Sequence, residues 1–258
     1  MIPVNRIILV IASLVISLAG YSQFHTFASR SELGFLAGGS YYIGDLNRYK
    51  HFKGSGPSVG LLYRYNVNPR LALRFNFGFL KVTGDDAWSD DPVAQNRNLN
   101  FRNRLFELAG GVEFHYMSFQ LGSQRNRATG YLLAQLGMFH MNPMTQYEGE
   151  WTELRPLQTE GQGTEIGSRR NYSKFQMAIP VGIGFKFALG DRVTFNIEYA
   201  IRKTFTDYID DVGADRYVDN VELSYLNGQT AAALSNRSID QDRYGVRGNS
   251  RSKDWYSS

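Results

Sequence analysis

Residues 174–187 read KFQMAIPVGIGFKF, and from Phe175 onward every second position carries a large apolar side chain. The positions between them are mostly small or polar and end with Lys186. A period of two places the large side chains on one face of a β-strand and the small or polar ones on the other. The stretch is long enough to cross a bilayer as a tilted strand, which takes about 9–11 residues.

Six further stretches alternate in the same way. They are 33–43, 59–66, 70–80, 106–116, 130–140 and 192–203. In 130–140 both faces are apolar, and Gln135 marks the set that we expect to face inward. Seven strands of this length favour a transmembrane β-barrel over a soluble sandwich, whose strands are usually shorter.

The connections between these strands alternate in length. The long ones are 45–56, 84–100, 142–173 and 204–258, and the shorter ones are 67–69, 120–129 and 189–191. Short periplasmic turns and longer outer loops are typical of outer-membrane barrels. We therefore predict an all-β protein, an antiparallel up-and-down transmembrane barrel in the outer membrane, with its mature N-terminus in the periplasm.

Closure of this barrel sets the expected strand number. Lipid offers backbone groups no hydrogen-bond partners, so strands can lie there only in a closed ring, and bacterial barrels have an even strand count. We predict eight strands, with the eighth beginning near Asp254, Trp255 and Tyr256. Because the sequence stops at Ser258, we expect the closing strand to be missing; a wrong count of strands is the alternative.

The composition excludes several classes of protein. The 258 residues contain no cysteine, so disulfides, a thiol nucleophile, cysteine-ligated zinc and a cysteine-linked lipid are ruled out. With 17 Phe, 16 Tyr and 3 Trp, the chain is too aromatic for a disordered coil. The net charge of +4 comes from mixed charges without a basic stripe, which predicts no nucleic-acid partner.

The N-terminus has the pattern of a secretory signal peptide over residues 1–22. Arg6 is followed by a short apolar run over 7–19, and the small residues Gly20 and Ser22 precede a cut before Gln23. An uncleaved N-terminal anchor is the alternative. Residues 23–258 then form a single barrel domain. Tyrosines gather near the predicted strand ends, as in interfacial girdles: Tyr41, Tyr42, Tyr63, Tyr65, Tyr116 and Tyr199.

The polar faces of the strands carry a set of charged residues that we expect to point inward. The set is Arg64, Arg74, Glu107, Glu113, His115, Lys186, Glu198 and Arg202. The interior of an eight-stranded barrel is just wide enough for side chains to fill it, and buried charges must pair. An ion-paired plug is therefore expected, with a proton path or a narrow pore as the alternative.

Candidate chemistry is sparse in this sequence. Glu113 and His115 share a face and suggest a lipid hydrolase, but no serine motif accompanies them, so we predict no catalytic residues and no cofactor. The other histidines, His25, His51 and His140, lack metal-ligand spacing, and no metal site is predicted. Two acidic groups suggest either Ca²⁺ binding or a role in a loop. For Asp207, Asp210, Asp211 and Asp215, ordering an outer loop or capping a turn is favoured. For Asp85, Asp86, Asp90 and Asp91 around Trp88, a solvated loop is favoured.

Three segments resemble one known family. Residues 32–47 (ELGFLAGGSYYIGDLN), 204–212 (TFTDYIDDV) and the pair 247–249 and 254–256 (RGN and DWY) are similar to the first strand and loop, the stretch after strand seven and the entry to the closing strand of the PorG-like outer-membrane barrels of the type IX secretion system. The resemblance covers about residues 32–256. It implies a non-enzymatic role in cargo export, in association with periplasmic ring subunits, a lipoprotein and its partner.

The alternative is an independent small barrel, such as a narrow pore, an adhesin or a lipid-modifying enzyme. If a ring partner exists, topology places its contacts near Asn68, 120–129 and Gly190, or on 23–31, because these segments face the periplasm. Arg125 and Arg127 form one candidate patch.

Overall fold

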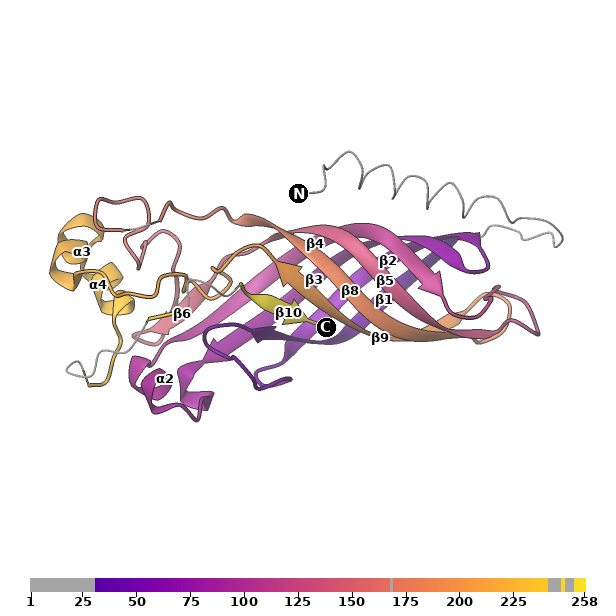
Figure 1. Ribbon diagram of the computed structural model, residues 1–258, viewed down its shortest axis with the longest axis horizontal. Helices are drawn as coiled ribbons and strands as arrows, with labels where there is room; N and C mark the ends of the chain where they lie inside the picture. The colour runs from indigo at the N-terminus through magenta and orange to yellow at the C-terminus, as the bar shows by residue number, and fades with distance from the viewer. Residues whose placement is uncertain (1–30, 168, 241–246, 249–252) are drawn as a thin grey trace, which may run out of the picture.

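One antiparallel sheet closes into a ring in the computed structural model, which describes residues 31–167, 169–240, 247–248 and 253–258. The signal peptide and residues 23–30 lie outside the described residues. The strands of the ring, in order around it, are β1(Ser31–Ile43), β2(Gly56–Asn68), β3(Leu71–Asp85), β4(Asn100–His115), β5(Ala128–His140), β8(Phe175–Ala188), β9(Thr194–Thr204) and β10(Trp255–Ser257) (Figure 1). This confirms the prediction of an eight-stranded, antiparallel up-and-down barrel.

All seven alternating segments are strands, and several extend beyond the predicted bounds. Strand β3 runs to Asp85 and β4 starts at Asn100, so that these two residues face each other at the end of the ladder. The alternation of large apolar residues fades there because the strands have left the apolar band, while the backbone ladder continues. Hydrophobic periodicity therefore marks only part of each strand.

The closing strand begins where it is predicted, at Trp255. It is short but present, so the expectation that it is missing is wrong. Tyr256 pairs with Tyr42 of β1 on one side and with Arg202 of β9 on the other. Its ring packs edge-on against Phe139 at 5.4 Å, and its hydroxyl donates to Glu107 Oε2 at 2.5 Å. These buried contacts hold the three residues of β10 in place. Such a short segment shows no alternation that the sequence could reveal.

The barrel is apolar outside and polar inside. Leu33 and Phe35 of β1 expose 85% and 89% of their surface. Most other outward side chains of the strands are also large and apolar, among them Val59, Leu61, Phe75, Phe77, Leu108, Leu136, Met177, Ile183 and Ile197. This polarity is the reverse of that of a water-soluble barrel and is the arrangement of a strand-built membrane protein.

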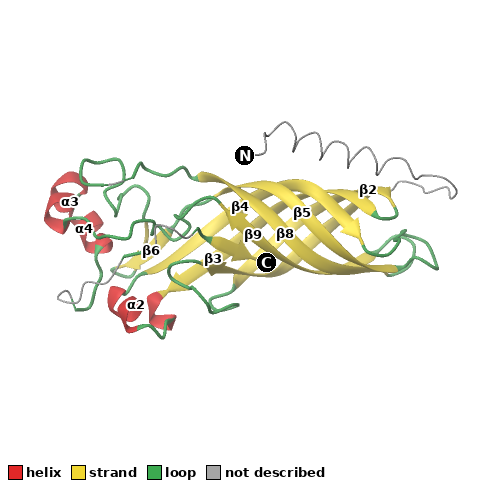
Figure 2. Cartoon of the chain, viewed as in Figure 1, coloured by secondary structure: helices red, strands yellow, loops and turns green. Residues whose placement is uncertain are grey.

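The long connections all lie at one end of the barrel and the short turns at the other (Figures 1 and 2). The long-loop end carries elements that the sequence analysis did not predict: η1(Asp86–Trp88), α2(Pro92–Arg97), the hairpin β6(Met144–Tyr147) and β7(Glu150–Glu153), α3(Asn220–Asn227) and α4(Gln229–Ser235). The side chains of Asp91 and Asp219 cap α2 and α3. Within the described parts of the chain, the helices are too short or too polar to span a membrane.

The predicted tyrosine girdle is only partly correct. Tyr63, Tyr65 and Tyr116 are exposed on the outer face, as expected. Tyr41 is buried instead because its ring packs against His51 and Phe52 of the loop after β1. Tyr42 is buried because it points inward, against Phe101 and the carboxyls of Asp210 and Asp254. The hydroxyl of Tyr41 lies 2.5 Å from that of Tyr199, which links β1 to β9.

Candidate functional site

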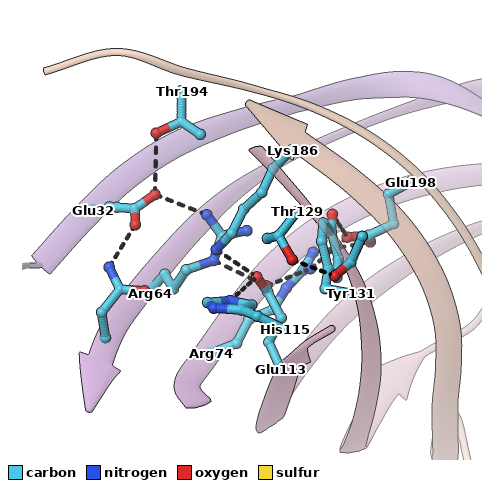
Figure 3. Close-up of polar contacts among 12 residues, drawn as sticks. Glu32, Arg64, Arg74, Glu113, His115, Thr129, Tyr131, Lys186, Thr194 and Glu198 are labelled. Carbon is cyan, nitrogen blue, oxygen red and sulfur yellow. Dashed lines mark hydrogen bonds and ion pairs between the residues drawn. The ribbon is translucent and has the colours of Figure 1, made fainter. Parts of the chain in front are cut away.

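Glu113 is the centre of the ion-pair cluster inside the barrel (Figure 3). Its side chain is fully buried. Oε2 accepts from Arg64 Nε at 2.9 Å and lies 3.4 Å from Arg74 Nη1, while Oε1 accepts from Lys186 Nζ at 2.9 Å and lies 3.0 Å from His115 Nε2. One carboxylate thus holds four side chains from β2, β3, β4 and β8.

Two further carboxylates complete this cluster. Glu32 Oε2 accepts from Arg64 Nη1 at 2.9 Å, and Glu198 Oε1 accepts from Arg74 Nη2 at 2.9 Å (Figure 3). The Tyr131 hydroxyl also donates to Glu198, at 2.8 Å. Two arginines and a lysine therefore face three glutamates. The predicted pairing of the inward charges is confirmed, and the balance of charge is what buried ions require.

A second buried pair lies nearer the long-loop end. Arg202 Nε is 3.3 Å from Glu107 Oε2, which also accepts from the Tyr256 hydroxyl. Arg202 Nη1 donates to the carbonyl of Ala200 at 3.0 Å. At the short-turn end, Phe119 lies under the cluster, with Lys186 Nζ 4.5 Å from its ring centroid. All eight residues predicted to face inward do so.

His115 is held on both ring nitrogens. Nε2 faces Glu113, and Nδ1 lies 3.1 Å from the carbonyl oxygen of Pro69. Among the described residues, these contacts of His115 include no serine hydroxyl. The Glu113–His115 pair is thus part of the plug, packed against Phe119 with ring centroids 5.9 Å apart.

Three of the four acidic residues after β9 are buried and order the long-loop end. Asp210 accepts from the Tyr42 hydroxyl at 2.5 Å and from the Val212 amide at 3.0 Å. Asp211 accepts from the hydroxyls of Thr159 and Tyr172 at 2.6 and 2.5 Å. Asp207 lies 3.4 Å from Arg169. The structural interpretation is correct for this group, while Asp215 is exposed.

Burial changes the acidity of these carboxyls. Desolvation raises the pKa of Asp211 to about 6, against hydrogen bonds from Thr159 and Tyr172 that lower it. Desolvation also raises the pKa of Asp207 to about 6. Asp210 and Asp254 lie together below the Tyr42 hydroxyl, and burial with their mutual repulsion raises the pKa of Asp210 well above its usual range. Over the described residues, no group of histidine or acidic side chains is arranged to hold a metal ion.

The acidic group around Trp88 is not a solvated loop throughout, which corrects that prediction. Asp86 is fully buried and accepts from Arg97 Nη2 and Nε at 2.6 and 2.8 Å. Asp85 caps η1, Asp91 caps α2, and Asp90 pairs with Lys50 at 2.7 Å.

Two arginines whose burial the sequence does not predict, Arg97 and Arg247, connect the outer loops. Arg97 reaches the carbonyls of Asp45 (3.0 Å) and Arg247, besides pairing with Asp86. Arg247 Nε donates to Glu160 Oε1 at 3.0 Å. Each arginine stands in a polar stretch that looks solvated, so no local pattern in the sequence marks it as buried.

The long-loop end also holds a cavity of about 260 Å³. Its polar lining includes Arg48, Lys50, Trp88, Asp90 and Asp91. Apolar side chains, among them Leu46 and Val93, also line it, so the cavity has a mixed character, and Lys50 and Asp90 already neutralise each other.

The short-turn end gathers the segments predicted to meet a periplasmic partner. The turns near Asn68, 120–129 and Gly190 lie together, since Phe119 N donates to the carbonyl of Pro69 and Ala188 N to that of Arg127. Four arginines are exposed on this end: Arg70, Arg125, Arg127 and Arg192. Exposed apolar side chains accompany them: Tyr116, Met117, Leu189 and Val193. This basic and apolar surface is named the turn face below.

A closed antiparallel ring with an apolar exterior and paired charges inside defines a transmembrane β-barrel. More particularly, the chain belongs to the family described as a domain of unknown function (DUF6089), whose model matches residues 5–236. No curated protein matches it. Among solved structures it is similar to Ail, the attachment invasion locus protein of Yersinia pestis, determined with the heparin analogue sucrose octasulfate. Identity is 13%, the match covers 69% of this chain and 90% of that chain, and the TM-score is 0.40.

Proposed function

We propose that this protein is a non-enzymatic component of the type IX protein secretion machinery, seated in the outer membrane of a Gram-negative cell. In this role it anchors or contacts a periplasmic ring of lipoprotein and partner subunits. Its mature N-terminus, after removal of residues 1–22, lies on the periplasmic side with the turn face. The resemblance of residues 32–47 and 204–212 to PorG-like barrels supports this assignment.

The observation that carries the proposal is the ion-paired interior. Glu113 forms ion pairs with Arg64, Arg74 and Lys186, and these paired side chains fill the inside of the barrel. Because each buried charge is needed to balance another, the exposed surfaces at the two ends of the barrel are the parts available for function. The turn face has four arginines and one exposed aspartate, Asp191, which favours a partner with an acidic surface.

Affinity capture from the native membrane tests this role. With a tagged full-length chain, we expect recovery of the periplasmic ring subunits, and charge reversal of Arg125 and Arg127 to weaken that recovery. Charge reversal of the exposed loop residues Arg170 and Arg216 is the matched control. Recovery of the barrel alone, or normal cargo secretion in a clean deletion strain, argues against the proposal.

A second candidate function has one observation in its favour. The cavity of about 260 Å³ at the long-loop end would suit an independent barrel that binds a small ligand outside the cell. Ligand binding that is lost in Trp88→Ala, with secretion intact in the deletion strain, would favour this alternative.

A further inference from the structure

The outer surface of β3 and β4 changes abruptly from apolar to basic. Phe79 of β3 lies opposite Phe106 of β4, with ring centroids 5.3 Å apart, and both belong to the apolar exterior. One step further toward the long loops on the same face, Lys81 lies opposite Arg104. The next outward pair is Thr83 and Arg102. Lys81, Arg102 and Arg104 are named the β3–β4 basic patch.

The register of this patch is unfavourable for the protein alone. Like charges directly opposite each other destabilise an antiparallel pair. Among the described residues, Lys81, Arg102 and Arg104 form no ion pair. Asp85, further along the same face of β3, accepts from the Ala87 amide at 2.9 Å, and Glu153 of β7 pairs with Lys174 at 3.4 Å. Within the described residues, no carboxylate therefore lies in ion-pair contact with the patch, although Asp85 stands on the same face.

Arg102 is held ready for an external partner. Its guanidinium lies over the ring of Trp151 in the β6–β7 hairpin, 3.7 Å from the centroid. Its Nε is buried and has no hydrogen-bond partner within the described residues. Stacking on an indole fixes the plane of the guanidinium, so an anion from outside would meet its terminal Nη groups, since Nε is buried. Tryptophan is also enriched at membrane–water interfaces.

The position of the patch identifies the kind of anion. Outward residues of β3 from Leu73 to Phe79 are apolar, and bands of this sort are about 25 Å tall and end at the headgroups. Lys81 and Arg104 follow this band directly, on the side of the long loops. In the membrane orientation of the proposed function, on which this step rests, that side is the outer leaflet.

We propose that the β3–β4 basic patch binds the phosphate of an outer-leaflet lipid headgroup. Arg102 and Arg104 supply guanidinium N–H groups that match phosphate oxygens, and Lys81 adds a third positive charge. The phosphate replaces the missing counterion between the cross-strand cations. Lipid binding thus converts an unfavourable register into a stabilising contact.

The test uses the purified full-length chain in micelles of a non-ionic, phosphate-free detergent, with and without diphosphoryl lipid A, and with the dephosphorylated lipid as the matched probe. Lipid retention is measured by native mass spectrometry, and barrel unfolding by the temperature of the gel-mobility shift. The variants are Lys81→Gln with Arg104→Gln, and Arg170→Gln with Arg216→Gln as a control with the same loss of charge at the same end of the barrel.

We expect the wild-type chain and the control to retain the phosphorylated lipid about tenfold more strongly than the dephosphorylated one. The patch variant should lose this preference. In phosphate-free micelles without lipid A, it should unfold at the same or a higher temperature than wild type, because the cation repulsion is gone. An unfolding temperature that is unchanged or higher shows that the variant has lost its ligand and not its fold.

Equal lipid preference in wild type and patch variant would overturn the proposal, as would an equal loss in the control variant. Complete displacement of the lipid by inorganic phosphate would also overturn it, because the site would then recognise free phosphate. If the chain shows no gel-mobility shift at all, the membrane placement in the proposed function fails. A normal shift without lipid preference removes the phosphate site alone.

Discussion

A single carboxylate decides the electrostatics of the interior. Glu113 is contacted by Arg64, Arg74, Lys186 and His115, so removing its charge leaves buried cations without their shared partner. Removing one member of a buried ion pair destabilises a protein far more than replacing both members by apolar residues. The stability of the barrel should therefore depend on this position more than on any pair of its surface charges.

Glu113→Gln should lower the free energy of unfolding by about 3–5 kcal/mol, because three buried cations then face two glutamates. The loss can be measured from the denaturant dependence of the gel-mobility shift. Glu150→Gln at the exposed tip of the β6–β7 hairpin is the control and should change stability by less than about 0.5 kcal/mol. Equal effects of the two substitutions would contradict the central place of Glu113.

The buried acid Asp211 predicts a pH dependence at the long-loop end. Its folded pKa of about 6 lies above the value of about 3.9 in an unfolded chain, so the folded state binds more protons between these values. Stability of the loop cap therefore falls as pH rises from about 4 to about 6 and then levels off for this group. Asp210 and Asp254, whose pKa values are also raised by burial, extend the fall to higher pH.

Hydrogen exchange of the amides over 207–214, corrected for intrinsic rates, should show stronger protection near pH 5 than near pH 7. Asp211→Asn should flatten this dependence, whatever it does to absolute stability. Asp215→Asn, at an exposed position, should leave it unchanged. An unaltered slope in Asp211→Asn would rule out Asp211 as a source.

At the scale of elements, the close approach of strands β4 and β5 requires a glycine at position 111. A Cβ at Gly111 would lie 2.2 Å from the Ala134 carbonyl oxygen and 2.6 Å from Gln135 Cα, both backbone atoms that cannot move without breaking the ladder. Gly38 faces the same interior from β1, but a Cβ there would meet nothing within 4 Å.

Gly111→Ala should therefore destabilise the barrel by about 1–3 kcal/mol, as overpacking does, while Gly38→Ala should be close to neutral. Denaturant titrations of the two variants side by side measure the difference. If both substitutions have the same effect, strand spacing at Gly111 is looser than the register implies.

The elements also show what the sequence could and could not predict. Strands β2, β3 and β8 were predictable because lipid-facing residues such as Phe75, Phe77 and Ile183 must alternate with the interior set. The start of strand β10 was predictable only from the need to close the ring, since Trp255–Ser257 is too short to alternate, and for that reason the strand was expected to be missing. The contacts inside the barrel were predictable only in part. Alternation along the strand indicates that Glu113 points inward, but the registers between strands decide that Arg64 and Lys186 meet it.

The buried charge pairs of the outer loops could not be predicted from the sequence. Asp86 and Arg97 form a buried pair across η1 and α2, and Arg247 joins Glu160 from a distant part of the chain. Such pairs depend on long-range packing, and isolated charges in polar stretches give no local sign of it. For this reason the sequence around Trp88 predicts a solvated loop although Asp86 is buried.

For the whole molecule, the filled interior predicts a barrel that does not conduct. The Glu113 cluster, the Glu107–Arg202 pair and Phe119 occupy the interior at successive levels. In planar bilayers, the folded wild-type protein should give no steady ion current, with a large porin as the positive control. A reproducible current from folded protein, absent after boiling, would contradict the plug and favour the pore alternative.

The short staple formed by β10 also sets an order of events in assembly. β10 pairs with β1, at the other end of the described chain, and with β9. The β1–β10 pairing therefore closes the longest stretch of chain in the barrel, while it forms only three paired positions. Contacts of that kind form late and break early, after the local hairpins are in place. Under mechanical load the barrel should therefore open first at the β1–β10 and β10–β9 pairings, which join β1 to β9.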